Sequence, residues 1–136
     1  MSVVPSSYGP SAGSSKTKIL IVDDNQPTAR ALSVLLRNAS YETAVAFRGA
    51  DALDLARAGG SFAAAIVDIH LPDISGLLVS QQLRDLLGPD VPIIVLSGDT
   101  SMQMLNSLPH VGATYFFSKP VSAEQLLDRL REWVAN

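Results

Sequence analysis

Five short apolar runs alternate with stretches of helical periodicity along most of the chain, and this order restricts the possible folds more than any other feature. The runs are KILIVD (18–23), ETAVAF (42–47), AAAIVD (63–68), PIIVLS (92–97) and TYFFS (114–118). Strands that are apolar throughout, rather than at every second residue, are typical of parallel sheets covered on both faces. Repeated strand–helix units with right-handed crossovers then predict a doubly wound α/β sandwich.

The stretches that follow the five runs predict five helices, because their apolar residues recur with a period near 3.6. Pro27 suits a first helical turn, and Ser122 with Gln125 forms a capping box that predicts the start of the last helix. The fourth helix, expected at about Thr100 to Leu108, has the shortest apolar stripe.

The length and composition fit one domain. The chain has 136 residues, of which 47% are hydrophobic, so it can bury a sizeable core but leaves no room for a second domain. Residues 1–15 contain six Ser, two Pro and two Gly without apolar periodicity. We therefore expect a flexible tail or linker at 1–15 and a folded domain at 16–136.

Charge and cysteine content exclude several functional classes. The chain has no Cys, which excludes a disulfide framework and thiolate chemistry and is compatible with the cytoplasm. Its net charge is −3 and its ten Lys and Arg are scattered, so direct nucleic-acid binding is not expected. No apolar run is long enough to span a membrane, and the N-terminus lacks the features of a secretion signal.

Chemically active residues occur where the predicted strands end. Asp23 and Asp24 end the first strand, Asp68 ends the third, Ser97 ends the fourth, and Lys119 follows the fifth. Doubly wound sheets bind their ligands at the carboxyl ends of the strands. Three carboxylates, a hydroxyl and an ammonium are thus expected at one edge of the sheet.

Such a carboxylate cluster predicts a divalent metal. Two carboxylates about 5 Å apart repel each other by about 3 kcal/mol at an effective dielectric constant of 20. Mg²⁺ would relieve this repulsion, because it prefers oxygen ligands and is often held by a few carboxylates together with water. A backbone carbonyl after Asp68, that of His70, is a further candidate ligand.

Four segments, ILIVDDN, IVDIHLPDISG, IIVLSGD and GATYFFSKP, resemble the signatures of the response-regulator receiver domain of two-component signalling. The resemblance spans Lys18 to Val134 and includes the order and spacing of the segments. It implies a flavodoxin-like (βα)5 fold with strand order 2-1-3-4-5 and a bound Mg²⁺. Single features would be uninformative, because an Asp pair after a strand is often only a turn and a helix cap.

The resemblance also implies a role for each site residue. By position, Asp68 is the phosphoacceptor, Asp23 and Asp24 are metal-binding acids, Ser97 is the hydroxyl switch residue, and Lys119 is the phosphoryl-binding cation. An incoming phosphoryl group would meet Asp68 as the in-line nucleophile, while Lys119, Ser97 and Mg²⁺ would stabilise the charge on its oxygens.

The same resemblance implies partners and an output. The phosphoryl group would come from a histidine kinase or a histidine phosphotransfer protein, and the domain would not be an enzyme beyond its own phosphorylation and dephosphorylation. Phe116 occupies the aromatic switch position, and the expected output is an altered surface of the fourth helix, fifth strand and fifth helix that a downstream protein reads. The sequence leaves open whether the domain stands alone or is the C-terminal receiver of a hybrid sensor kinase.

Two alternatives use the same residues differently. Haloacid-dehalogenase-type phosphohydrolases also combine an Asp nucleophile with Mg²⁺, but their nucleophile follows the first strand in a D-x-D pattern, whereas Asp68 follows the third and is followed two residues later by His70. The other alternative is a receiver-like interaction module that is never phosphorylated. The presence of every reactive group argues against such an unphosphorylated module.

Overall fold

The computed structural model describes residues 17–59, 61–98, 106 and 112–134. In chain order its elements are β1 (Lys18–Val22), α1 (Gln26–Asn38), β2 (Glu42–Ala46), α2 (Gly49–Arg57), β3 (Ala64–Asp68), α3 (Gly76–Leu87), β4 (Ile93–Ser97), β5 (Tyr115–Ser118) and α5 (Ala123–Trp133). The predicted fourth helix, apart from Asn106, and the predicted tail at 1–15 lie outside the described residues.

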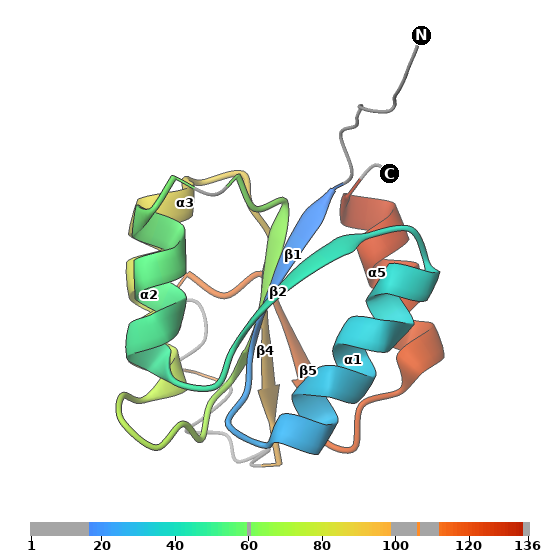
Figure 1. The fold of residues 1–136 in the computed structure, drawn as a ribbon, viewed down its shortest axis with the longest axis horizontal. Coiled ribbons are helices and arrows are strands. Elements are labelled where there is room, and N and C mark those ends of the chain that lie inside the picture. The colour runs from blue at the N-terminus through green and yellow to red at the C-terminus, as the bar shows by residue number, and fades with distance from the viewer. Residues whose placement is uncertain (1–16, 60, 99–105, 107–111, 135–136) are drawn as a thin grey trace, which may run out of the picture.

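The five strands form one parallel sheet in the order β2-β1-β3-β4-β5. Helices α1 and α5 cover one face of this sheet, and α2 and α3 cover the other (Figure 1). The predicted doubly wound α/β fold with strand order 2-1-3-4-5 is therefore confirmed. Each predicted strand is present, and its observed bounds differ from the predicted ones by at most one residue at either end.

The unbroken apolar runs are explained by two separate cores, one on each face of the sheet. In β1, Ile19 and Ile21 pack with residues of α1 and α5, whereas Leu20 and Val22 pack with residues of α2 and α3. Successive side chains of a strand point to opposite faces, so a central strand between two helical layers needs apolar residues at every position. All residues of β3 and β4 are buried, as this arrangement requires.

The helix starts show how the loops at the carboxyl edge of the sheet are fixed. The side chains of Asn25, Ser75 and Ser122 each accept a hydrogen bond from a backbone N–H in the first turn of α1, α3 and α5. Ser122 thus caps α5, as predicted, by accepting from the Gln125 backbone N–H. Helix α2 differs, because Arg48, the residue before it, makes no such side-chain bond.

The guanidinium of Arg84 ties α3 to the far ends of β4 and β5. It donates hydrogen bonds to the backbone carbonyls of Gly88, Val91 and Gly112, and to the hydroxyl of Thr114, at 2.6 to 3.1 Å. The Thr114 hydroxyl also accepts from the Ile93 backbone N–H. A single side chain therefore connects two loops, the one between α3 and β4 and the one before β5, at the edge of the sheet opposite the candidate site.

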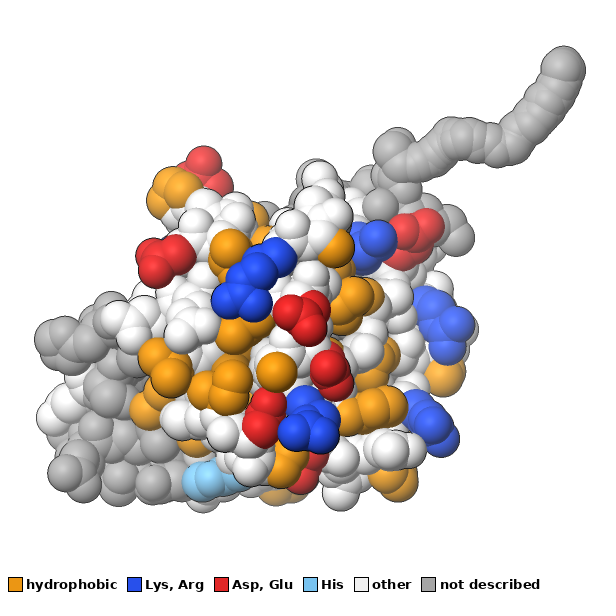
Figure 2. Space-filling view, turned by 60° about the vertical axis from the view of Figure 1, so that its left-hand side comes forward, with side chains coloured by type: hydrophobic (Ala, Val, Ile, Leu, Met, Phe, Trp, Pro, Cys, Tyr) orange, Lys and Arg blue, Asp and Glu red, His pale blue; other side chains and the backbone are white. Residues whose placement is uncertain are grey.

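Among the described residues, no helix combines the length and apolar character that a membrane crossing needs. On the side of the molecule that carries α2, the visible Lys and Arg side chains stand apart from one another among Asp and Glu (Figure 2). The described residues of this face therefore form no extended basic patch of the kind that binds phosphate backbones.

The hydroxyl of Tyr41 provides a stability prediction. Tyr41 is 1% exposed, and its hydroxyl has no hydrogen-bond partner in the described part of the chain. Since an unpaired buried hydroxyl costs about 1–3 kcal/mol of desolvation, Tyr41→Phe should raise the free energy of unfolding by about 1 kcal/mol, measured by chemical denaturation. Tyr115→Phe, at a half-buried site, is the control and should change stability by less than about 0.5 kcal/mol. A clear loss of stability in Tyr41→Phe would show that the hydroxyl has a partner in solution.

Candidate phosphoacceptor and metal site

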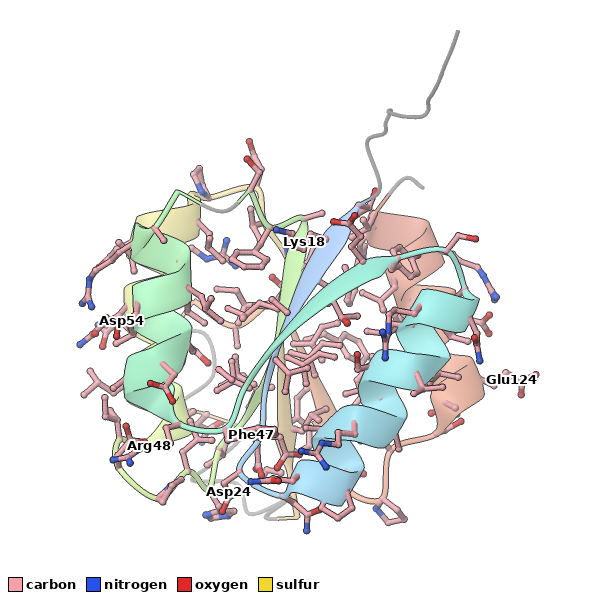
Figure 3. All side chains as sticks on the ribbon, viewed as in Figure 1. Lys18, Asp24, Phe47, Arg48, Asp54 and Glu124 are labelled. Carbon is pink, nitrogen blue, oxygen red and sulfur yellow. The ribbon has the colours of Figure 1, made fainter. Side chains whose placement is uncertain are left out.

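The parallel register brings the predicted site residues to one edge of the sheet. Asp68 is the last residue of β3 and Ser97 the last of β4, while Asp23 and Asp24 directly follow β1. Lys119 directly follows β5, and its backbone N–H donates to the Ser97 carbonyl at 2.9 Å. In Figure 3 Asp24 lies at the lower edge of the sheet, where the strands of Figure 1 end.

An ion pair lies at the centre of the site. The Lys119 ammonium nitrogen is 2.9 Å from Oδ2 of Asp68 and 3.9 Å from Oδ2 of Asp23. The first distance is a charge-assisted hydrogen bond, whereas the second is too long for one. Because Asp68 is 3% exposed, this ammonium is the main source of positive charge next to a buried carboxylate.

The three carboxylates form a cluster suited to a hard divalent cation. Asp23, Asp24 and Asp68 each offer an oxygen, and these oxygens all lie within 4.8 Å of one another. Asp23 and Asp68 are buried while Asp24 is exposed. Oδ2 of Asp23 is buried and has no hydrogen-bond partner among the described residues. An acidic oxygen-only donor set with one unsatisfied buried oxygen fits Mg²⁺, which would supply the missing partner.

The pKa of the Asp23 carboxyl also indicates that the carboxylate cluster favours a bound cation. Burial raises the pKa of the Asp23 carboxyl above its ordinary value, and the neighbouring Asp68 carboxylate raises it further. The Asn25 backbone N–H and the Lys119 ammonium act in the opposite direction without cancelling this pKa rise. Since burial disfavours the charged form, ionising Asp23 is harder in the metal-free fold than in the unfolded chain.

The loop after β3 holds the second oxygen of Asp68. The backbone N–H of His70 donates to Asp68 Oδ1 at 3.1 Å, so both oxygens of this carboxylate have partners. The His70 side chain is exposed and, with Asp24, borders an open hollow of about 540 Å³ beside the cluster. The hollow therefore opens to solvent beside Asp24, the exposed acid of the cluster.

Ser97 ends β4, which pairs with β3, and Phe116 lies in β5, which pairs with β4. Ser97 is fully buried, and Phe116 is half-buried and pairs in register with Val95, two residues before Ser97. The structure therefore brings together Asp23, Asp24, Asp68, Ser97 and Lys119 as predicted, with Phe116 on the adjoining strand.

Two residues near the site were not singled out from the sequence. The carboxylate of Asp73 bonds to the start of α2, and Gly76 lies against the Asp68 backbone. Both occur in the segment IVDIHLPDISG, but a surface Asp and a glycine have many ordinary explanations in a sequence. Only the tertiary contacts distinguish them.

Comparison with known proteins agrees with this site. The family model of the response regulator receiver domain matches residues 19–131. The chain is a response-regulator receiver domain. This assignment agrees with the order of the four segments that carry the site, and it makes the haloacid-dehalogenase alternative unnecessary.

This receiver domain is similar to several signalling proteins and to solved receiver structures. It is 32% identical over 118 residues to the sensory/regulatory protein RpfC of Xanthomonas campestris, covering 85% of this chain and 16% of that protein. It covers about half of the length of other curated relatives. Its fold matches chemotaxis protein CheY4 of Vibrio cholerae with a TM-score of 0.81, 30% identity and coverage of 88% and 100% of the two chains.

A third relative was solved in a modified state. The receiver domain is 33% identical to a response regulator protein from Burkholderia pseudomallei, with a TM-score of 0.76 and coverage of 82% of this chain and 65% of that one. That structure is described as containing a phosphorylated aspartic acid, a calcium ion and citrate.

Proposed function

We propose that this receiver domain is a phosphorylation-activated switch in which Asp68 accepts a phosphoryl group in the presence of Mg²⁺. The observation that carries the proposal is the contact of the Lys119 ammonium with Asp68 Oδ2, at 2.9 Å, within a cluster of three carboxylates. A nucleophilic carboxylate, a cation for the transferred group and an acidic metal site are the parts that phosphoryl transfer needs.

The site residues have different roles in the proposed phosphoryl transfer. A carboxylate oxygen of Asp68 forms a bond to phosphorus while the phosphorus–nitrogen bond of a phosphohistidine donor breaks, and the electron pair of that bond stays on the donor nitrogen. Lys119 and the Ser97 hydroxyl stabilise the negative charge spread over the phosphoryl oxygens. Asp23, Asp24 and Asp68, with the His70 carbonyl as a further candidate, would hold Mg²⁺, which supplies additional positive charge at the phosphoryl oxygens when bound.

The related Burkholderia protein supports this proposal, because its described structure combines a phosphorylated aspartic acid with a divalent cation. The unpaired oxygen of Asp23 supports it independently, since a buried acceptor without a partner is unfavourable unless a ligand or metal satisfies it. In this function the domain is a phosphoacceptor and not an enzyme acting on other substrates.

Phosphorylation of Asp68 can be tested directly. With Mg²⁺ and acetyl phosphate, intact-mass spectrometry should show one labile phosphoryl adduct, which should be absent in Asp68→Asn because the amide lacks a nucleophilic oxygen anion. Asp90→Asn, at an exposed position, is the matched control and should form the adduct like the wild type. No adduct on the wild type would favour an unphosphorylated interaction module, and an adduct on Asp68→Asn would move the acceptor elsewhere.

We propose a histidine kinase or histidine phosphotransfer protein as the phosphoryl donor. The proposed downstream partner is a protein that binds the surface of the predicted fourth helix, β5 and α5. A cytoplasmic location is part of the same proposal. The match to RpfC, of which the chain covers a small part, supports the hybrid-kinase arrangement, while the full coverage of CheY4 supports a stand-alone receiver.

The output proposal predicts a role for the Phe116 ring. Movement of Ser97 toward the phosphoryl group would free space that the half-buried ring can enter, because packed interiors have discrete arrangements. Phe116→Ala should bind the phosphoryl mimic beryllofluoride but lose most of the amide shift changes at 102–108, while Phe116→Tyr should keep them. A full set of shifts in Phe116→Ala, measured by NMR titration, would show that the switch does not depend on this ring.

A further inference from the structure

Helix α2 and the loop after the phosphoacceptor are joined by one carboxylate. Asp73 lies 24 residues after the start of α2, and its Oδ1 and Oδ2 accept hydrogen bonds from the backbone N–H groups of Gly49 and Ala50, at 2.9 and 3.0 Å. These N–H groups belong to the first turn, where a helix has no internal acceptors for them. Asp73 therefore caps a helix that is distant from it in sequence.

The first backbone N–H groups of α2 need an acceptor from elsewhere, because the residue before this helix does not cap it. Arg48 occupies the capping position, lacks a side-chain acceptor and makes no capping bond. Figure 3 shows Arg48 at the same lower edge of the sheet as Asp24, so the start of α2 lies at the carboxyl edge that carries the site. The hydrogen bonds from Ala50 and Gly49 lower the pKa of the Asp73 carboxyl, consistent with a carboxylate that is ionised when it caps.

The close approach of α2 to this loop is built into the packing. A Cβ atom on Gly49 would lie 2.7 Å from Cγ2 of Val79 and 3.2 Å from Cβ of Ile74. The absence of a side chain at Gly49 therefore lets α2 approach both the loop and α3. Any larger residue would separate the N–H groups from Asp73.

The other end of the same loop contacts the reacting carboxylate. The His70 backbone N–H bonds to Asp68 Oδ1 at 3.1 Å, and the loop closes where Gly76 donates to the Ile69 carbonyl at 2.8 Å. Within this closed segment, the side chain of Asp73 accepts hydrogen bonds from the backbone of a separate helix. Its anchor thus restricts how far the His70 backbone can move relative to Asp68.

We infer that Asp73 is a positioning residue of the phosphoacceptor site: by capping α2 it fixes the 69–75 loop, and through that loop it holds the His70 backbone against Asp68 and the metal-binding carboxylates. The expected effect of Asp73 on metal binding rests on the proposed function, whereas its expected effect on the His70 backbone does not.

The test compares Asp73→Ala with Asp51→Ala. Asp51 is an exposed acid in the first turn of α2, and in the part of the chain that the structure describes no hydrogen bond joins its side chain to the loop. Both variants should lower the melting temperature slightly, because both remove a negative charge near the positive end of the helix dipole. Only Asp73→Ala should shift the His70 amide resonance in metal-free protein and weaken Mg²⁺ binding about tenfold.

Further variants make the result decisive. Asp73→Asn keeps one acceptor oxygen and should give a smaller His70 shift and a smaller loss of Mg²⁺ affinity, and it replaces Asp73→Ala if the latter does not fold. If the variants lose thermal stability while the His70 resonance and the Mg²⁺ dissociation constant stay at wild-type values, Asp73 only caps α2 and the inference is wrong. If the wild type itself binds no Mg²⁺, the proposed function fails, and the His70 shift alone decides the role of Asp73.

Discussion

Asp23→Asn should unfold at a higher temperature than the wild type when no divalent metal is present. Oδ2 of Asp23 is buried without a hydrogen-bond partner beside Asp68, and a buried unsatisfied group of this kind costs about 1–3 kcal/mol or more when it is charged. The amide removes the charge and keeps an oxygen for the Asn25 backbone N–H. We expect a gain of about 1–2 kcal/mol in the metal-free protein at neutral pH.

The pH dependence of this gain follows from the raised pKa of Asp23. Below the ordinary value of 3.8 the carboxyl is protonated in both the folded and the unfolded chain, so it costs no stability. As the pH rises from 3.8 through the raised pKa, the unfolded chain loses its proton first and the fold becomes less stable. The advantage of Asp23→Asn should therefore be small below 3.8 and complete above the raised pKa.

Mg²⁺ should reverse the order of stability. The wild type should gain stability with Mg²⁺ because ligand binding stabilises the folded state, while Asp23→Asn should bind Mg²⁺ at least about tenfold more weakly. Asp24→Asn is the matched control, since Asp24 is exposed: it should weaken Mg²⁺ binding with little change in metal-free stability. Calorimetry of the three proteins with and without Mg²⁺ checks this, and a metal-free Asp23→Asn that is less stable than the wild type would show that the ionised carboxylate is structural.

Gly76→Ala should lower the free energy of unfolding by about 3 kcal/mol or more. A Cβ atom at this position would lie 2.2 Å from the Asp68 carbonyl oxygen and 2.5 Å from the Ile69 Cα atom. Both are backbone atoms and cannot rotate away, so β3 and α3 would have to separate. Because the displaced backbone carries Asp68, the variant should also be phosphorylated more slowly by acetyl phosphate.

Gly98→Ala is the matched control for this prediction. Among the described residues, a Cβ atom on Gly98 would meet nothing within 4 Å, so the stability of Gly98→Ala should stay within about 0.5 kcal/mol of the wild type. Urea denaturation followed by circular dichroism measures both variants. Equal stability of Gly76→Ala and wild type would mean that the loop after β3 is not held against α3 in solution.

The sequence alone determined the fold class and the edge of the sheet that carries the site. Unbroken apolar runs such as AAAIVD, separated by helical periodicity, require strands buried on both faces, and such strands place Asp68, Ser97 and Lys119 at one edge. These are consequences of side-chain periodicity and of parallel topology. For this reason they could be predicted without knowledge of any contact.

Only the tertiary structure distinguished residues that look alike in the sequence. Asp23 and Asp24 are adjacent carboxylates, yet Asp23 is 1% exposed with an unpaired oxygen and Asp24 is exposed, because β1 ends between the two helical layers and the chain turns outward after it. Asp73 and Gly76 gain their roles from atoms on α2 and β3 that lie close in space but not in sequence. Burial, close approach and capping across the chain depend on how the helices pack on the sheet, and local sequence patterns do not contain that information.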